Sequence, residues 1–399
     1  MEKPEGKSLS GRVIPAHLAS LGPHYISLEM PELSDRDLAA TVHTTQGDYR
    51  VVVGRGVVDQ IADEMQAAGL GGRAFLVADV AVFPTAVHRV HEALERGGFV
   101  TNVLALELNE ARKSLETVQE VYAWLAGHRA ERGDVIVAMG GGVAGDLVGF
   151  AAATWLRGVA FVQVPTSLAA MVDASIGGKT AVNLPIGKNL VGAFFQPRLV
   201  LQDIDHLQTL PKREMAAGWA EAIKHGLILD ADLLDTFEKH AGEMQALEGD
   251  LPVEAIRRSV QIKAEVVSAD EFERGDTRVL LNYGHTVGHA IEAVTGYGQF
   301  LHGEAVSIGM MAAARIAERL GMIGRELVDR QRAVLTRYNL PLTVSGVTAE
   351  QVIAATRSDK KTRGGTVRWV LLEGPGKATT RREVPENIVR EAVEEVIAG

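Results

Sequence analysis

Hydrophobic and polar positions along residues 45–205 predict strands and helices in alternation. Short apolar runs bounded by glycine or polar residues indicate buried strands, and longer stretches with apolar residues three and four positions apart indicate helices. The predicted strands cover residues 49–54, 73–79, 100–106 and 134–139, and the predicted helices cover residues 57–68, 86–96 and 114–129. This alternation is typical of a parallel sheet with helices packed against it.

The pattern changes after about residue 205, where helical spacing dominates. Helices are predicted at residues 212–229, 233–244, 253–269, 285–294, 304–320 and 326–338, and a strand at residues 368–372. The predicted fold class is an α/β N-terminal domain with a Rossmann-like parallel sheet (residues 45–205), followed by a mostly α-helical C-terminal domain (residues 206–399). For residues 1–44 we expect either a loosely ordered extension without an assigned role or an extra strand or helix packed on the main body.

Composition excludes several classes of chemistry. The 399 residues include no cysteine, which excludes disulfides, thiolate metal sites and cysteine nucleophiles. A formal net charge of −10 argues against bulk binding of nucleic acid or an anionic membrane. The apolar runs are too short for a membrane span of about 20 residues, and the polar segment 1–10 does not resemble a secretory signal. We therefore expect a cytoplasmic protein without nucleic-acid or membrane partners.

A glycine-rich turn follows the predicted strand 134–139 and opens a helix. Gly140, Gly142 and Gly145 fit the pattern G-x-G-x-x-G, in which backbone N–H groups approach a pyrophosphate. The acidic residue that usually follows about 20 residues later is missing, so Asp79, at the end of an earlier strand, is the better candidate to bind a ribose. NAD is the ligand indicated. A tight packing turn at the glycines and a turn-forming role for Asp79 are the alternatives.

Polar residues are dense in the segment that follows. Arg157 comes after an apolar helix, and Asp173 lies shortly before two lysines, Lys179 and Lys188, that each follow a glycine. We expect both lysines to lie in loops. Lysines of this kind indicate contacts to phosphate or carboxylate, and solvated loop lysines are the alternative.

Three histidines and one glutamate suggest a metal site held by helices. His285 and His289 share a helix face, His302 precedes the next predicted helix, and Glu221 lies on the predicted helix 212–229. In a chain without cysteine, two histidines and a glutamate are natural ligands for a catalytic zinc that keeps an open position for substrate. Spacing alone leaves open which two of the three histidines bind the metal.

Further cations surround these positions in the sequence. Lys224 lies one helical turn from Glu221, and Lys263, Arg278 and the pair Lys360–Lys361 follow. On an acidic chain such cations fit an anionic substrate, whereas a solvated charged face is the alternative. The residues alone therefore suggest a zinc-polarised alcohol that transfers hydride to NAD.

The motifs between about residues 49 and 384 closely resemble those of the 3-dehydroquinate synthases, within the sugar phosphate cyclase family. The matching segments, in the family's order, are GGGVAGDLVGF (140–150), QVPTSL (163–168), VDASIGGK (172–179), GKN (187–189), GAFFQP (192–197), LPKRE (210–214), LNYGHTVGHAIE (281–292) and HGE (302–304). Ser167 stands where a second threonine is common, and Val287 where phenylalanine is common. The first 44 residues have no counterpart.

The resemblance implies a full set of site residues. Zinc, with Co²⁺ as an alternative, would be held by Glu221, His285 and His302, and His289 would then lie in the substrate phosphate region. NAD contacts would be Asp79, Glu110, Lys113, Gly142, Val143, Ala144, Gly145, Asp146, Thr166, Ser167, Lys179, Lys188 and Thr209. Substrate contacts would be Asp173, Lys179, Asn189, Lys224, Lys263, Arg278, Asn282, His289 and one of Lys360 and Lys361. Arg157 would reach the phosphate site of a neighbouring subunit, which implies a homodimer.

The reaction implied by the resemblance belongs to the shikimate pathway of aromatic amino acid biosynthesis. It converts 3-deoxy-D-arabino-heptulosonate 7-phosphate, a small anionic sugar phosphate, into 3-dehydroquinate and phosphate. The steps are transient oxidation by NAD, phosphate elimination, reduction, ring opening and intramolecular aldol closure. Two rival functions remain: a sister cyclase that makes 2-deoxy-scyllo-inosose or 2-epi-5-epi-valiolone, and a metal-dependent alcohol dehydrogenase of the glycerol dehydrogenase type.

Overall fold

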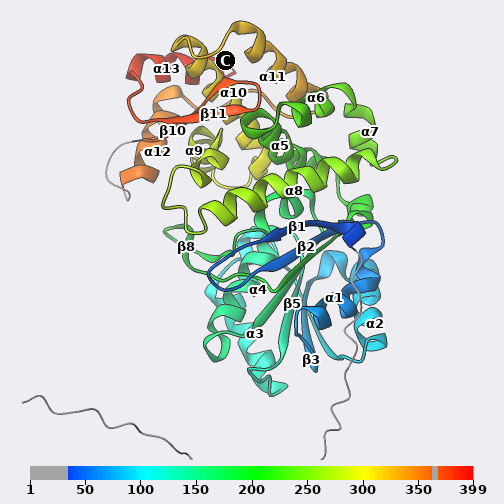
Figure 1. Ribbon diagram of the computed structural model, residues 1–399. Helices are drawn as coiled ribbons and strands as arrows, with labels where there is room; N and C mark the ends of the chain where they lie inside the picture. The colour runs from blue at the N-terminus through cyan, green and yellow to red at the C-terminus, as the bar shows by residue number, and fades with distance from the viewer. Residues whose placement is uncertain (1–34, 362–366, 399) are drawn as a thin grey trace, which may run out of the picture. The chain divides into compact units, whose positions relative to one another are not determined.

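A seven-stranded sheet forms the N-terminal part of the protein (Figure 1). The computed structural model describes residues 35–361 and 367–398, with side chains described throughout these ranges except at positions 83, 85 and 358–361. The strand order is β1-β2-β9-β6-β5-β3-β4, in which β1 is antiparallel to β2 and the other neighbouring pairs are parallel. The strands are β1 (Leu38–Val42), β2 (Tyr49–Gly54), β3 (Arg73–Asp79), β4 (Val100–Leu106), β5 (Val135–Gly140), β6 (Ala160–Pro165) and β9 (Leu199–Asp203).

Helices cover both faces of this sheet, which explains the continuous apolar runs of its central strands. α1 (Ile61–Ala67) and α2 (His88–Arg96) pack on one face, and α3 (Leu115–Gly127) and α4 (Gly142–Thr154) on the other. Along β5, Val137 belongs to the first core, and its neighbour Ile136 belongs to the second. All residues of β5 are therefore buried, and no polar alternation marks the strand.

The carboxyl ends of β3 and β5 lie side by side. The chain continues from β3 to β4 on one side and from β5 to β6 on the other. Neighbouring parallel strands whose connections diverge in this way create the crevice in which α/β proteins bind ligands. The fold therefore places the end of β3, at Asp79, beside the glycine turn after β5.

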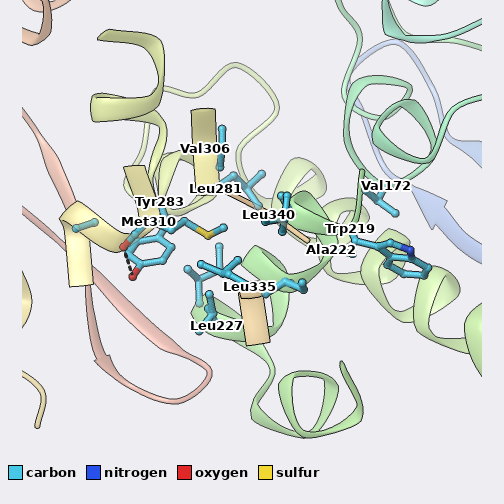
Figure 2. Packing of buried hydrophobic residues seen from close by; sticks show 14 of the residues in the cluster. Val172, Trp219, Ala222, Leu227, Leu281, Tyr283, Val306, Met310, Leu335 and Leu340 are labelled. Carbon is cyan, nitrogen blue, oxygen red and sulfur yellow. Dashed lines mark hydrogen bonds between the residues drawn. The ribbon is translucent and has the colours of Figure 1, made fainter. Parts of the chain in front are cut away.

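The C-terminal part is mostly helical (Figure 1). Its core surrounds Trp219 and Tyr283, both fully buried (Figure 2), and the Tyr283 hydroxyl lies 2.8 Å from Gln331 Oε1 and 3.3 Å from the carbonyl oxygen of Met310. The helices are α5 (Lys212–Leu229), α6 (Ala231–Lys239), α7 (Ala241–Ala246), α8 (Leu251–Ala269), α9 (His285–Val294), α10 (His302–Arg319), α11 (Arg325–Arg337), α12 (Ala349–Lys361) and α13 (Glu386–Glu394).

Two hairpins and several short helical turns complete the described fold. The hairpins are β7 (Lys179–Leu184) with β8 (Gly187–Phe194), and β10 (Trp369–Gly374) with β11 (Lys377–Arg381). The short turns are η2 (Asp35–Asp37), η3 (Val57–Gln60), η4 (Val80–Val82), η5 (Phe83–Val87), η6 (Glu110–Arg112), η7 (Trp155–Arg157), η8 (Ala170–Ala174), η9 (Ile204–Thr209) and η10 (Arg278–Asn282).

The predicted fold class is confirmed, and several local predictions are wrong. Lys179 and Lys188 lie on the strands β7 and β8 rather than in loops, because the glycines beside them mark the ends of a hairpin. The predicted helix 233–244 is divided between α6 and α7 at His240, whose φ of −120° is not helical. The sequence patterns also missed β7, β8, β9, β11, α12 and α13. Within residues 1–44, Leu38–Val42 form the edge strand β1, the alternative that the sequence left open.

Candidate active site

The glycine turn is built where β5 meets α4. Gly140 has a φ of +150°, Gly141 precedes the helix, and Gly142 is its first residue, so the first-turn N–H groups of α4 face the carboxyl edge of the sheet. A methyl group on Gly145 would collide with the buried Gln163 amide. The glycine at position 145 therefore serves close packing, whereas Gly141 and Gly142 are partly exposed. Val143 and Ala144 lie in the same first turn.

Four further residues predicted to contact NAD lie at the carboxyl ends of strands or just beyond them. Asp79 lies beside Gly140, and its Oδ1 accepts a hydrogen bond of 3.1 Å from the N–H of Ala81. Asp79 therefore also has the turn-forming role that the sequence offered as an alternative to ribose binding. The Thr166 N–H donates to the Gly140 carbonyl at 2.9 Å. The Ser167 hydroxyl lies against Gly141. Thr209 ends η9, where its hydroxyl donates to the His206 carbonyl at 3.3 Å.

A polar network joins α4 to the β7–β8 hairpin. The Lys113 ammonium donates to Asp146 Oδ2 and to Asn189 Oδ1, both at 2.6 Å. Burial raises the pKa of Asp146, against the opposing effect of Lys113. Lys188 Nζ lies 3.4 Å from Glu110 Oε1. The structure thus brings together cofactor residues predicted on separate segments, and it places Asn189, predicted at the substrate, with them.

Glu221, His285 and His302 converge from three different helices. Glu221 Oε1 lies 3.8 Å from His285 Nε2 and 3.5 Å from His302 Nε2. The nitrogens of His285, His289 and His302 also lie close enough together to hold an ion. Glu221 is fully buried on α5, and its Oε1 has no hydrogen-bond partner among the described residues. A buried carboxylate oxygen without a partner is costly unless a cation completes it.

The donor set fits a divalent metal. Ligand atoms about 2.0–2.1 Å from a tetrahedral zinc are about 3.4 Å apart, close to the separations between Glu221 and the two histidines. His285 Nδ1 lies 3.1 Å from the Tyr283 carbonyl and His302 Nδ1 lies 3.3 Å from Glu292 Oε2. Both rings can therefore donate through Nδ1 and present the lone pair of Nε2. Burial, with Lys224 nearby, holds the pKa of His285 well below its ordinary value, which favours the neutral ligand form.

The cations predicted at the substrate are held by carboxylates in the same region. Lys224 pairs with Glu221, Lys263 with Asp173, and Lys179 with Glu273. Glu273 also accepts a hydrogen bond of 2.9 Å from Asn282 Nδ2. Two of these pairs join the sheet domain to the helical domain, since Asp173 and Lys179 precede α5 and their partners lie on or after α8.

Arg278 is held differently from the lysines. Its side chain is almost completely buried, and its guanidinium donates to the carbonyl of Gly177 at 3.1 Å and to the carbonyl of Glu271. Arg278 Nε has no hydrogen-bond partner among the described residues. The guanidinium is therefore fixed by backbone rather than free in solvent.

One predicted residue, Arg157, stands apart from the site. Arg157 is exposed at the far end of α4, where Leu156, Arg157 and Gly158 have φ values of +49°, +67° and +120°. The side chains of Lys360 and Lys361, at the end of α12, lie outside the part of the structure whose side chains are described. Their predicted contact with substrate is not placed here.

Comparison with known proteins identifies the family. Residues 103–217 match the family described as 3-dehydroquinate synthase N-terminal, and residues 218–362 match 3-dehydroquinate synthase C-terminal. A 3-dehydroquinate synthase of Nostoc punctiforme is 45% identical over 356 residues, which cover 88% of this chain and 98% of the relative. The chain belongs to the 3-dehydroquinate synthase family. A relative of the same name from Nitrosospira multiformis is 46% identical over 326 residues, covering 82% of this chain and 89% of that one.

Solved structures of sugar phosphate cyclases resemble this member of the 3-dehydroquinate synthase family. A 2-epi-5-epi-valiolone synthase of Streptomyces hygroscopicus subsp. jinggangensis, with NAD⁺ and Zn²⁺ bound, has a TM-score of 0.80 at 29% identity and covers 87% of this chain and 96% of its own. A 2-deoxy-scyllo-inosose synthase complexed with carbaglucose-6-phosphate, NAD⁺ and Co²⁺ has a TM-score of 0.79 at 27% identity, with coverages of 90% and 99%. A glycerol dehydrogenase of Schizosaccharomyces pombe, at 17% identity and a TM-score of 0.61, shares the fold.

Sequence reasoning missed two carboxylates of this family member's site. Glu273 binds Lys179 and Asn282, and Glu292 lies beside His302. For Glu292 a signal was present, because it follows His289 by three residues on the same helix face. For Glu273 there was none, since it lies in an irregular segment after α8.

Within the described residues, no helix is long and apolar enough to cross a membrane.

Proposed function

We propose that this chain is a 3-dehydroquinate synthase that converts 3-deoxy-D-arabino-heptulosonate 7-phosphate into 3-dehydroquinate and phosphate. The observation that carries the proposal is the convergence of Glu221, His285 and His302 within reach of the paired cations Lys224 and Lys263. The identity of 45% over 98% of the length of a relative with this name supports the same reaction. The enzyme would be a phosphate-eliminating carbon–oxygen lyase.

The metal site consists of Glu221, His285 and His302 in this proposal, with Zn²⁺ as the metal and Co²⁺ as the alternative. A divalent metal there supplies a Lewis acid for a substrate hydroxyl. Lys224 neutralises the second carboxylate oxygen of Glu221 and keeps the first directed to the two imidazoles. His289 lies beside both histidines, with ring centroids 5.4 Å and 5.7 Å away, and is assigned to the substrate phosphate.

NAD would bind along the carboxyl edge of the sheet and supply a reversible hydride acceptor. The N–H groups of Gly142, Val143 and Ala144 in the first turn of α4 would receive the pyrophosphate, and Gly145 and Asp146, which follow on the same helix, are assigned to NAD with them. Asp79 at the end of β3 would bind a ribose hydroxyl. The other residues assigned to NAD are Glu110, Lys113, Thr166, Ser167, Lys179, Lys188 and Thr209.

The substrate residues orient anions and hold protons. Lys179, Lys224 and Lys263 are fixed by carboxylates before substrate arrives, so little side-chain entropy remains to be lost on binding. Arg278, fixed by two backbone carbonyls, and Asn282 are assigned to the substrate carboxylate. The other residues assigned to the substrate are Asp173, His289, Asn189 and one of Lys360 and Lys361. Asn189 lies next to the residues assigned to NAD.

The chain would act as a cytoplasmic homodimer in which Arg157 completes the phosphate site of the neighbouring subunit. α4, with 13 residues, is about 20 Å long and separates Arg157 from the glycine turn of its own subunit. Among the described residues, the Arg157 guanidinium has no hydrogen bond or ion pair. We place the boundary between the cofactor domain and the metal- and substrate-binding domain near residue 205.

The test is a phosphate-release assay with purified enzyme. With the heptulosonate phosphate, release should require NAD⁺ and a divalent metal, and absorbance at the NADH wavelength should not accumulate, because the hydride returns to the product. Glucose 6-phosphate and sedoheptulose 7-phosphate serve as matched substrates without a carboxylate. Preferred turnover of either sugar phosphate would assign the chain to a sister cyclase, and steady NADH accumulation would assign it to the alcohol dehydrogenases.

A further inference from the structure

Glu292 lies between the proposed metal ligands and the β7–β8 hairpin, which we call the cofactor hairpin. No role has been assigned to this residue. It lies on α9, on the helix face that also carries His285 and His289. Only 8% of the residue is exposed. Its two carboxylate oxygens point to different partners, which is unusual for a residue that only fills space.

One oxygen of Glu292 holds the His302 ring. Glu292 Oε2 lies 3.3 Å from His302 Nδ1, while His302 Nε2, on the other side of the ring, lies 3.5 Å from Glu221 Oε1. A histidine N–H that donates to a carboxylate fixes the tautomer and orientation of the ring and makes the other nitrogen a better ligand.

His302 depends on such a partner more than His285 does. The His285 side chain is 10% exposed and its Nδ1 faces a backbone carbonyl, so packing and main chain hold it. The His302 side chain is 43% exposed and belongs to the first residue of α10. Packing alone therefore leaves the His302 ring free to rotate.

The other oxygen of Glu292 faces the sheet domain. Glu292 Oε1 lies 3.7 Å from the Lys188 ammonium on β8, and the same ammonium lies 3.4 Å from Glu110 and 4.6 Å from the Tyr297 ring centroid. Lys188 thus stabilises the Glu292 carboxylate from the opposite domain.

We propose that Glu292 is a positioning residue that directs His302 Nε2 toward the metal, and that Lys188 of the cofactor hairpin holds the Glu292 carboxylate in place. This inference rests on the metal site of the proposed function. It adds to that site a link from the metal ligands to the cofactor hairpin through one carboxylate.

The experiment measures Co²⁺ binding to metal-free protein by its visible absorption spectrum, without any turnover. Glu292→Gln keeps the shape but removes the charge, and the Co²⁺ affinity should fall about 10- to 100-fold with an altered spectrum. Lys188→Met should lower the affinity by a smaller factor. Glu292→Asp, which keeps the charge on a shorter side chain, should lie between the wild type and Glu292→Gln.

The matched control is Glu304→Gln. Glu304 is in the same first turn of α10 as His302, where it pairs with Arg213 at 2.6 Å and accepts a hydrogen bond from the Leu301 N–H, away from the imidazole. Because glutamine can still accept from the Leu301 N–H and the lost ion pair is with a largely exposed arginine, the Co²⁺ affinity of Glu304→Gln should stay within about threefold of the wild type. Circular dichroism of each variant separates loss of the ligand geometry from loss of folding.

The outcomes separate this inference from the proposed function. If Glu221→Ala keeps wild-type Co²⁺ affinity, the metal site itself is wrong. If Glu221→Ala loses the metal while Glu292→Gln keeps both affinity and spectrum, only the positioning role is wrong. Equal losses in Glu292→Gln and Glu304→Gln would also overturn it, because the effect would then be general to the helix start. If Glu292→Gln does not fold, wild-type binding by Glu292→Asp and Lys188→Met overturns the role.

Discussion

Asp173 and Lys263 show how burial tunes a single charged group in this site. Lys263 is 7% exposed, and burial lowers its pKa to about 8, although its partner Asp173 acts in the opposite direction. Lys224 and Arg278 lie near enough to lower the pKa of Lys263 further. Lys263 and Lys224 in turn hold the pKa of Asp173 well below its ordinary value, against the effect of burial. The pair therefore brings one negative and one titratable positive charge to the proposed substrate position.

This pKa predicts a pH dependence of substrate capture. A solvated lysine stays charged up to about pH 10, whereas Lys263 loses its proton as the pH rises through about 8. Because the substrate is an anion, kcat/KM for the heptulosonate phosphate should fall by up to about tenfold per pH unit above that value. The phosphate ester ionises near pH 6, so it does not titrate in this window. Initial rates at low substrate between pH 7 and 10 measure the effect.

The control for this prediction is Lys263→Arg. Arginine stays protonated throughout the range, so its kcat/KM should be lower overall but flat above pH 8. A fall of the same steepness in the arginine variant would assign the ionisation to another group.

At the scale of elements, close contacts between three helices bring the proposed metal ligands together. α5, α9 and α10 each carry one of them, and glycines let the helices approach. A methyl group on Gly303 would collide with the carbonyl oxygen of Ala217 on α5, and one on Gly309 would collide with the carbonyl of Gly284 before α9. Glycines at these crossings thus set the separation of Glu221, His285 and His302.

Gly303→Ala should therefore separate α10 from α5. Overpacking of this kind costs about 1–3 kcal/mol, or more where backbone opposes it, and His302 would move with the helix. We expect a lower urea midpoint and a weaker Co²⁺ affinity. Gly242→Ala on α7 is the matched control, since no atom lies within 4 Å of the added methyl group, and it should gain up to about 1 kcal/mol from helix propensity. Wild-type stability and metal binding in Gly303→Ala would show that Gly303 does not set the distance between α10 and α5.

The same helices show what the sequence could and could not predict. Helical spacing of apolar residues located α5, α8, α9, α10 and α11, although α5 and α10 are buried on nearly every side, and it missed the hairpin β7–β8, which has no continuous apolar run. Helical spacing placed His285 and His289 on one face. It could not place Glu221 beside them, because that contact depends on how α5 crosses α9 and α10. The pairing of Glu273 with Lys179 joins residues 94 positions apart and left no local pattern.

At the scale of the whole molecule, ion pairs link the two domains at the site. Asp173–Lys263, Lys179–Glu273 and Lys188–Glu292 each join a residue of the sheet domain to one of the helical domain. The net charge of −10 gives no hint of this local gathering of cations. Substrate and cofactor would bind where these pairs meet, so residues of both domains would line the binding site.

The proposed homodimer leads to a prediction that distinguishes an Arg157 acting in the neighbouring subunit from one acting in its own subunit. If Arg157 acts across the interface, Arg157→Ala and Glu221→Ala are each inactive alone, yet a mixed dimer has one complete site. That site combines the metal ligands of the Arg157→Ala subunit with Arg157 from the Glu221→Ala subunit. Random association of equal amounts should restore about a quarter of the wild-type specific activity.

Co-expression with two different tags and tandem purification isolates the mixed dimer. Its activity per dimer should be about half of the wild type, because one of its two sites is complete. Size-exclusion chromatography of the wild type gives the mass of the assembly independently. A mixed dimer without activity would place Arg157 at the site of its own subunit. A monomeric wild type with full activity would show that no interface is needed. The backbone strain of the left-handed turn at Leu156–Gly158 would then have no functional explanation.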